Sequence, residues 1–98
     1  MERIATIVAY DIADPKRLRR VFEICRGFGD HLQFSVFRAD LTPRARAELV
    51  AALDGVINHN EDQILLVTIG PTEGTRVNKA FSALGRPYTH PEFHATIL

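Results

Sequence analysis

Hydrophobic residues form three segments whose spacing is typical of β-strands. Residues 3–10 (RIATIVAY) and 63–70 (QILLVTIG) are nearly continuous apolar runs, which predicts strands covered on at least one face. Residues 31–41 (HLQFSVFRADL) alternate between two sets of side chains and also favour a strand. This middle segment lacks the usual hairpin turn residues, so it is either one kinked strand or two strands joined without an obvious turn. The alternation assigns Phe34 to the core and Phe37 to a dimer interface or the neighbourhood of a metal.

Apolar residues recur every three or four positions in three other segments, which predicts amphipathic helices. The first covers residues 14–28 and begins with Asp14 as its N-cap. The second covers residues 42–56 and begins with Thr42, and both caps are followed by a proline, which suits the first helical position. A shorter third helix is expected over residues 75–85.

The order strand, helix, strand, helix, strand is the skeleton of an α+β ferredoxin-like sandwich of the βαββαβ type. The apolar residues 93–98 predict an extra C-terminal strand that a four-stranded core does not need. An unused strand on a small domain tends to pair with an exposed sheet edge. We therefore expect residues 1–98 to form one homodimeric domain, in which residues 86–98 are an extension that pairs with the other protomer.

The composition is that of an ordinary globular protein, with 46% hydrophobic and 24% charged residues. No apolar run is long enough to span a membrane, and charge near the N-terminus argues against a signal peptide, so we expect a cytoplasmic protein. The single cysteine, Cys25, excludes an internal disulfide and a cysteine-based zinc site, and its position predicts core packing. Because the net charge is zero, only the arrangement of charges can indicate a nucleic-acid partner.

Positive charge is concentrated on the outer face of the first predicted helix. At 100° per residue, the basic residues opposite its apolar stripe are Lys16, Arg19, Arg20 and Arg26. Such a face is ordinarily a solvated surface, and Glu23 is spaced to neutralise part of its charge. In a dimer, two such helices would still carry enough cations for phosphate contacts along a duplex.

Several motifs resemble, in order, those of the small CRISPR-associated protein of the second family, the partner of the spacer integrase. They are IVAYDI at the end of the first strand, DPKRLRRV at the start of the first helix, QFSVFRADL in the middle, and the apolar terminal segment. The resemblance implies a ferredoxin-like homodimer that binds double-stranded DNA and joins the integrase subunits. It also implies Mg²⁺-dependent endonuclease activity on DNA or RNA.

The resemblance also assigns roles to individual residues. The residues that match the family pattern are Tyr10, Asp11, Arg17, Arg20, Ser35 and Phe37. It makes Asp11 the metal ligand and catalytic residue, adds Arg17 to the nucleic-acid-binding set, and gives Tyr10, Ser35 and Phe37 supporting roles. His31 stands where many members carry a basic residue. Because Mg²⁺ is usually held by one or two carboxylates with water and phosphate, the second copy would supply the missing carboxylate.

A second hypothesis from another class is a ferredoxin-like ligand-binding or regulatory dimer, in which Asp11 only caps a turn. Fold alone does not separate the two hypotheses, whereas salt-dependent DNA binding does. His90 and His94 are four residues apart, but Pro91 argues against a helix there, so they are interpreted as surface residues. The glycines of GPTEG lack the lysine and hydroxyl residue of a phosphate loop and are interpreted as turn residues.

Overall fold

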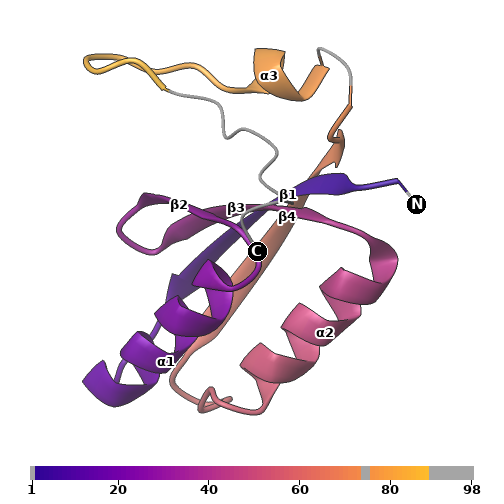
Figure 1. Cartoon of the computed structure of the whole chain (residues 1–98). Helices are drawn as coiled ribbons and strands as arrows, with labels where there is room; N and C mark the ends of the chain where they lie inside the picture. Colours follow the sequence, from indigo (N-terminus) through magenta and orange to yellow (C-terminus); the bar gives the residue numbers. More distant parts are fainter. Residues whose placement is uncertain (1, 74–75, 89–98) are drawn as a thin grey trace.

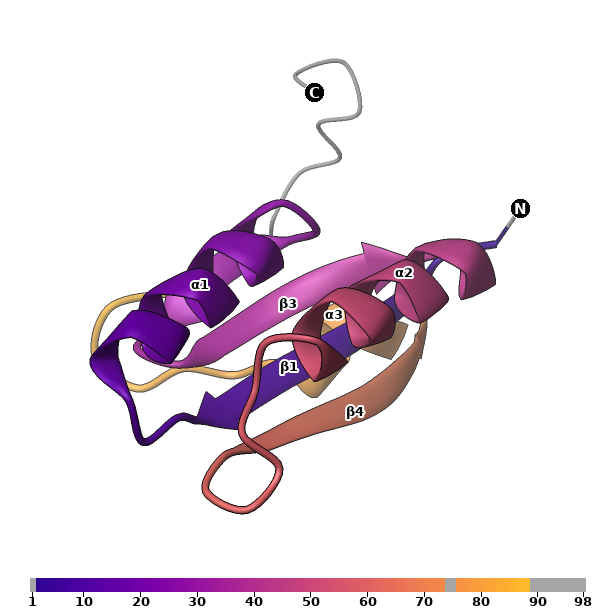
Figure 2. The same ribbon diagram turned by 90° about the horizontal axis from the view of Figure 1, so that it is seen from below.

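A four-stranded antiparallel sheet carries two long helices on one face and a short third helix on the other (Figure 1, Figure 2). The computed structural model describes residues 2–73 and 76–88. In chain order, the elements are β1 (Ile4–Asp11), α1 (Pro15–Arg26), β2 (Asp30–Gln33), β3 (Val36–Leu41), α2 (Pro43–Asp54), β4 (Gln63–Pro71) and α3 (Arg76–Ala80). No helix within these ranges has the length and hydrophobicity that crossing a bilayer requires.

The strands are ordered β2-β3-β1-β4, and every neighbouring pair is antiparallel. Strand β1 is therefore central, between β3 and β4, although these strands follow it by long stretches of chain. This order, with one helix after β1 and one after β3, is that of the ferredoxin-like sandwich, so the predicted fold class is confirmed. The predicted strand at 93–98 and the histidines at 90 and 94 lie outside the described residues.

The two long helices begin where the sequence predicts. The carboxylate of Asp14 accepts hydrogen bonds from the backbone N–H groups of Lys16 and Arg17, both at 3.0 Å. The hydroxyl of Thr42 accepts the N–H of Ala45 at 3.1 Å. Each cap satisfies backbone donors that have no partner inside the helix, which fixes the start of α1 and α2.

Helices α1 and α2 bury their apolar stripes against one face of the sheet. The buried residues of this helix-side core are Val8, Tyr10, Val21, Cys25, Phe37, Ala39, Leu41, Leu49 and Leu53. The prediction that Cys25 packs in the core is confirmed, and burial raises the pKa of its thiol to about 11. Gly29 lets the chain leave α1 close to β3, because a Cβ at this position would run into the backbone of Arg38 and Ala39.

The middle segment forms two strands joined by a two-residue turn, which was one of the two predicted arrangements. Gln33 pairs with Val36, and the turn consists of Phe34 and Ser35 instead of the glycine or asparagine that such turns favour. The assignment of Phe34 to the core was wrong, since its side chain is 94% exposed. The alternation of side chains between the two faces is interrupted within residues 31–41, because the chain reverses direction at the turn.

The third helix is shorter than predicted. It covers Arg76–Ala80 and buries Val77 completely, whereas Leu84, expected on the same stripe, is fully exposed. A short helix is stabilised mainly by the apolar face that it buries. Val77 is the only fully buried residue of this helix, and the helix ends three residues after it.

Candidate functional site

Asp11 ends strand β1 with its side chain on the face opposite the two long helices. Tyr10, one residue earlier, is only 6% exposed and belongs to the helix-side core. Successive side chains of a strand point to opposite faces, so Asp11 points away from this core and is exposed. Its partner across the β1–β4 pair is Gln63, the first residue of β4. The strand thus presents a carboxylate at one end of the face opposite α1 and α2.

The part of this face that β1 and β4 form next to Asp11 is apolar and only partly covered. Residues directly opposite each other in an antiparallel pair share a face. The pairs Ile7–Val67 and Ala9–Leu65 therefore lie on the same side as Asp11. Helix α3 lies on this side of the sheet (Figure 1), yet Leu65 and Val67 each remain 52% exposed. We call Leu65, Val67 and the β1 residues paired with them the open apolar face.

The described residues of one chain do not complete a metal site around Asp11. Within residues 2–73 and 76–88, no three His, Cys, Asp or Glu side chains lie close enough together to hold an ion. A carboxylate is nevertheless the oxygen ligand that Mg²⁺ prefers, and Mg²⁺ often keeps several waters. Asp11 therefore fits as one protein ligand, and a second would have to come from outside the described residues.

The basic face of α1 is present as predicted, and none of the ion pairs in the described part of the chain involves its cations. Its cations are Lys16, Arg19, Arg20 and Arg26, all of which are exposed. Glu23 was expected to neutralise part of this charge, but the ion pairs found in the described ranges do not include it. Four cationic side chains on one helix thus remain available to an anionic partner. Their role in nucleic-acid binding stays a prediction.

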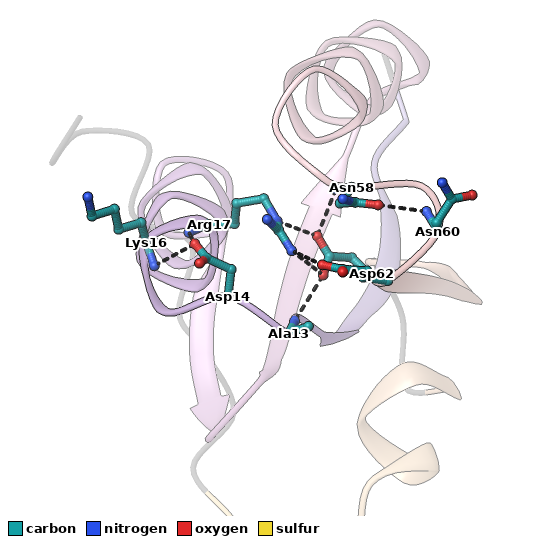
Figure 3. A network of polar contacts seen from close by, with 8 residues as sticks. Ala13, Asp14, Lys16, Arg17, Asn58, Asn60 and Asp62 are labelled. Atoms are coloured by element: carbon teal, nitrogen blue, oxygen red, sulfur yellow. Dashed lines mark hydrogen bonds and ion pairs between the residues drawn. The ribbon is translucent and has the colours of Figure 1, made fainter.

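Arg17 is placed differently from these four residues. Its guanidinium crosses to the loop between α2 and β4, where Nε donates to Asp62 at 2.8 Å and Nη2 donates to Glu61 at 3.0 Å (Figure 3). Only 24% of the Arg17 side chain is exposed. The structure thus commits Arg17 to an internal network, and a phosphate would have to compete with two carboxylates for it.

Asp62 is the centre of that network. Its side chain is inaccessible to solvent and also accepts the backbone N–H groups of Ala13 at 2.9 Å and Asn58 at 2.8 Å (Figure 3). The hydrogen bond from Arg17, aided by these two N–H groups, outweighs burial and holds the pKa of Asp62 well below its usual range. Ala13 lies two residues after Asp11, so this carboxylate fixes the loop that follows the candidate metal ligand.

Sequence reasoning did not identify Asp62. Residues 58–62 (NHNED) have only the polar composition of a loop. The partners of Asp62 lie 4, 45 and 49 residues away along the chain. The local signal that was present is the pair of Asx residues, Asn58 and Asp62, which commonly bond nearby backbone in loops.

The three residues with predicted supporting roles lie close together near the end of β1, and they are Tyr10, Ser35 and Phe37. The carbonyl of Ser35 accepts the backbone N–H of Tyr10 at 3.0 Å, which ties the β2–β3 turn to the end of β1. Phe37 is completely buried, with its ring centroid 6.3 Å from that of Tyr10, 5.3 Å from Phe22 and 4.9 Å from His31. Burial also raises the pKa of Tyr10. Phe37 is thus a core residue, and in this chain it does not line an exposed surface.

Comparison with known proteins gives a consistent result across sequence and structure. A family model described as "CRISPR associated protein Cas2" matches residues 4–77. A protein named CRISPR-associated endoribonuclease Cas2 1, from Rhodospirillum rubrum, is 38% identical over 94 residues, which cover 96% of this chain and 90% of that protein. A CRISPR-associated endoribonuclease Cas2 from Geobacter sulfurreducens is also 38% identical, with 84% of each chain covered.

Two solved structures have the same fold. Streptococcus pyogenes Cas2 superposes with a TM-score of 0.69 at 28% identity and covers 83% of this chain and 99% of its own. A hypothetical protein from Thermus thermophilus superposes with a TM-score of 0.73 at 23% identity, with 89% of this chain and 96% of its own covered. The residues matched by the family model include β1 with Asp11 and the whole of α1.

Proposed function

Because this chain belongs to the Cas2 family of CRISPR-associated proteins, we propose that it acts in CRISPR adaptation as a Mg²⁺-dependent endonuclease and a DNA-binding homodimer. In this role, the dimer holds duplex DNA and bridges the subunits of the spacer integrase. The names of its relatives favour RNA as a substrate for cleavage. The single observation that carries the proposal is the exposed Asp11 at the end of the open apolar face, near the start of a helix with four free cations.

The homodimer is supported by the open apolar face. Leu65 and Val67 are half exposed on the side of the sheet that carries Asp11. A second copy packed on this face by two-fold symmetry would cover both residues and bring a second Asp11 toward the first. This arrangement supplies a second carboxylate, which the described part of one chain does not place beside Asp11.

The chemistry of the site follows from the positions of these residues. Asp11 would hold Mg²⁺, which polarises a phosphoryl oxygen and lowers the pKa of a bound water. The basic face of α1 would bind the phosphates on either side of the scissile bond, since arginine forms paired hydrogen bonds with phosphate oxygens. Tyr10, buried in the core, and Asp62, bonded to Ala13, hold the backbone on both sides of Asp11 and so fix the direction of its carboxylate.

Asp11→Asn tests the proposal, because it removes the charge and nearly preserves the shape. Cleavage of single-stranded RNA and of duplex DNA is measured with Mg²⁺ and with a chelator, together with the melting temperature in both conditions. The variant should lose the metal-dependent cleavage and the increase in melting temperature that Mg²⁺ causes in the parent. It should still dimerise and bind nucleic acid, since neither property depends on that carboxylate.

Asp30→Asn is the matched control, because Asp30 is an exposed carboxylate at the start of β2. It should leave cleavage and the Mg²⁺ response unchanged. If Asp11→Asn cleaves as fast as the parent, Asp11 is a turn residue and the proposed metal site is wrong. Absence of any salt-dependent nucleic-acid binding by the parent would favour the ligand-binding or regulatory dimer instead.

A further inference from the structure

Phe34 is an exposed aromatic residue at the end of the sheet that carries the candidate metal ligand. The register between β1 and β3 ends at Ala9–Val36, and the hydrogen bond from Tyr10 N–H to the Ser35 carbonyl continues it by one residue. The next residues in the two directions are Asp11 and Phe34. The β2–β3 turn and the end of β1 accordingly lie at the same end of the sheet (Figure 1).

The backbone of Phe34 has a conformation that its side chain does not favour. Its φ of +29° is the only positive value at a non-glycine residue among the described positions. Bulky residues rarely adopt positive φ, and glycine or asparagine is the usual choice in such a turn. Residues held in this way cluster at functional sites, where the surrounding structure imposes the conformation.

Two contacts impose this conformation on the turn. The His31 ring nitrogen Nε2 lies 2.7 Å from the carbonyl oxygen of Phe34, and the His31 ring packs against Phe22 and Phe37 of the core. The Ser35 carbonyl is bound by Tyr10 on the other side of the turn. The turn is therefore fixed from both sides, while its largest side chain is 94% exposed.

Burial does not explain a phenylalanine at this position, because almost none of its ring is covered within the chain. An exposed aromatic ring on a fixed turn, at the end of the sheet that carries a candidate metal ligand, fits the architecture of single-strand nucleic-acid sites. In such sites, bases stack on aromatic rings while basic residues hold the backbone. Here the basic face of α1 begins five residues after Asp11, at Lys16.

We propose that Phe34 stacks on a nucleobase of the strand whose phosphate lies at Asp11, and so positions the scissile bond. The proposal rests on the proposed function of Asp11. It requires an unpaired base next to the site, since a base inside a duplex has both faces covered by its neighbours.

Tryptophan fluorescence provides the test, because the chain contains no tryptophan and Phe34→Trp introduces a single one. The full-length variant is titrated with a single-stranded RNA oligonucleotide and with the same strand lacking its bases. Stacking should quench the fluorescence with the first strand and not with the second. Val50→Trp, on α2 and 41% exposed before substitution, is the matched control and should respond to neither strand.

Binding of the same RNA by Phe34→Ala and Phe34→Leu completes the experiment. Both variants should bind about 5- to 150-fold more weakly than the parent, because leucine keeps the apolar surface but not the aromatic face. Phe34→Trp should bind as tightly as the parent. The melting temperatures should stay within about 4 °C of the parent value, since an exposed side chain contributes little to folding.

The possible failures point to different errors. If the parent binds the RNA but the alanine and leucine variants bind it equally well, the role of Phe34 is wrong and the proposed function stands. If the parent binds no nucleic acid, the proposed function is wrong and this inference fails with it. If Phe34→Ala dissociates the dimer in sedimentation while each protomer binds RNA as before, Phe34 belongs to an interface between copies, which also overturns the inference.

Discussion

Replacing Phe37 with alanine should destabilise the fold by about 3–5 kcal/mol. The ring is completely buried among Tyr10, Phe22 and His31, so its removal leaves a cavity in the helix-side core. A domain of 98 residues has a total stability of about 5–15 kcal/mol. The expected loss is therefore a large fraction of the whole, and it corresponds to a decrease in melting temperature of at least about 12 °C.

Thermal unfolding followed by circular dichroism measures this loss, and Phe37→Leu is the control. Leucine fills most of the space, so this variant should lose only about 1–2 kcal/mol. Cleavage is then assayed well below both melting temperatures, where the folded fraction of each variant is high. A Phe37→Ala protein that melts within about 4 °C of the parent and has lost cleavage would refute the reasoning, because Phe37 would then act directly at the site.

Three further predictions follow from other contacts. The free energy of unfolding of the parent should decrease as the pH falls below about 3.8, because folding lowers the pKa of Asp62 and protonation of this carboxylate then weakens the folded state. In acid denaturation, Asp62→Asn should lose less of its free energy of unfolding over this range. Replacing Arg19, Arg20 and Arg26 with alanine should flatten the dependence of DNA affinity on salt, for which about six phosphate contacts give a logarithmic slope of roughly −5 in the parent; an unchanged slope would place the DNA elsewhere. Gly29→Ala should cost about 1–3 kcal/mol in thermal unfolding, whereas Gly55→Ala, whose Cβ would have ordinary contacts, should be neutral or stabilising.

The regular elements could be predicted because their signals are local. The caps Asp14 and Thr42 lie next to the helices that they start, and the continuous apolar runs of β1 and β4 identify strands without tertiary information. The sheet order also follows from the order of the elements, once the ferredoxin-like pattern is recognised.

The remaining features depend on contacts between distant parts of the chain. The turn at Phe34 is imposed by His31 and by the backbone of Tyr10, so its own sequence does not indicate a turn. Arg17 fits the pattern of a basic helix, and only the fold reveals that Asp62, 45 residues later, takes its guanidinium. Candidate ligands could thus be proposed from sequence, whereas the residues that orient them could not.

The alternation between Tyr10 and Asp11 restricts how this sequence can change during evolution. Insertion or deletion of one codon within β1 would exchange the faces of all side chains on one side of the change. The carboxylate would then enter the apolar core and the tyrosine would take its place on the open apolar face, so a single event would damage both folding and the site. Loops tolerate changes in length far better, and we expect length variation among relatives to avoid β1 and to accumulate in the connections between elements.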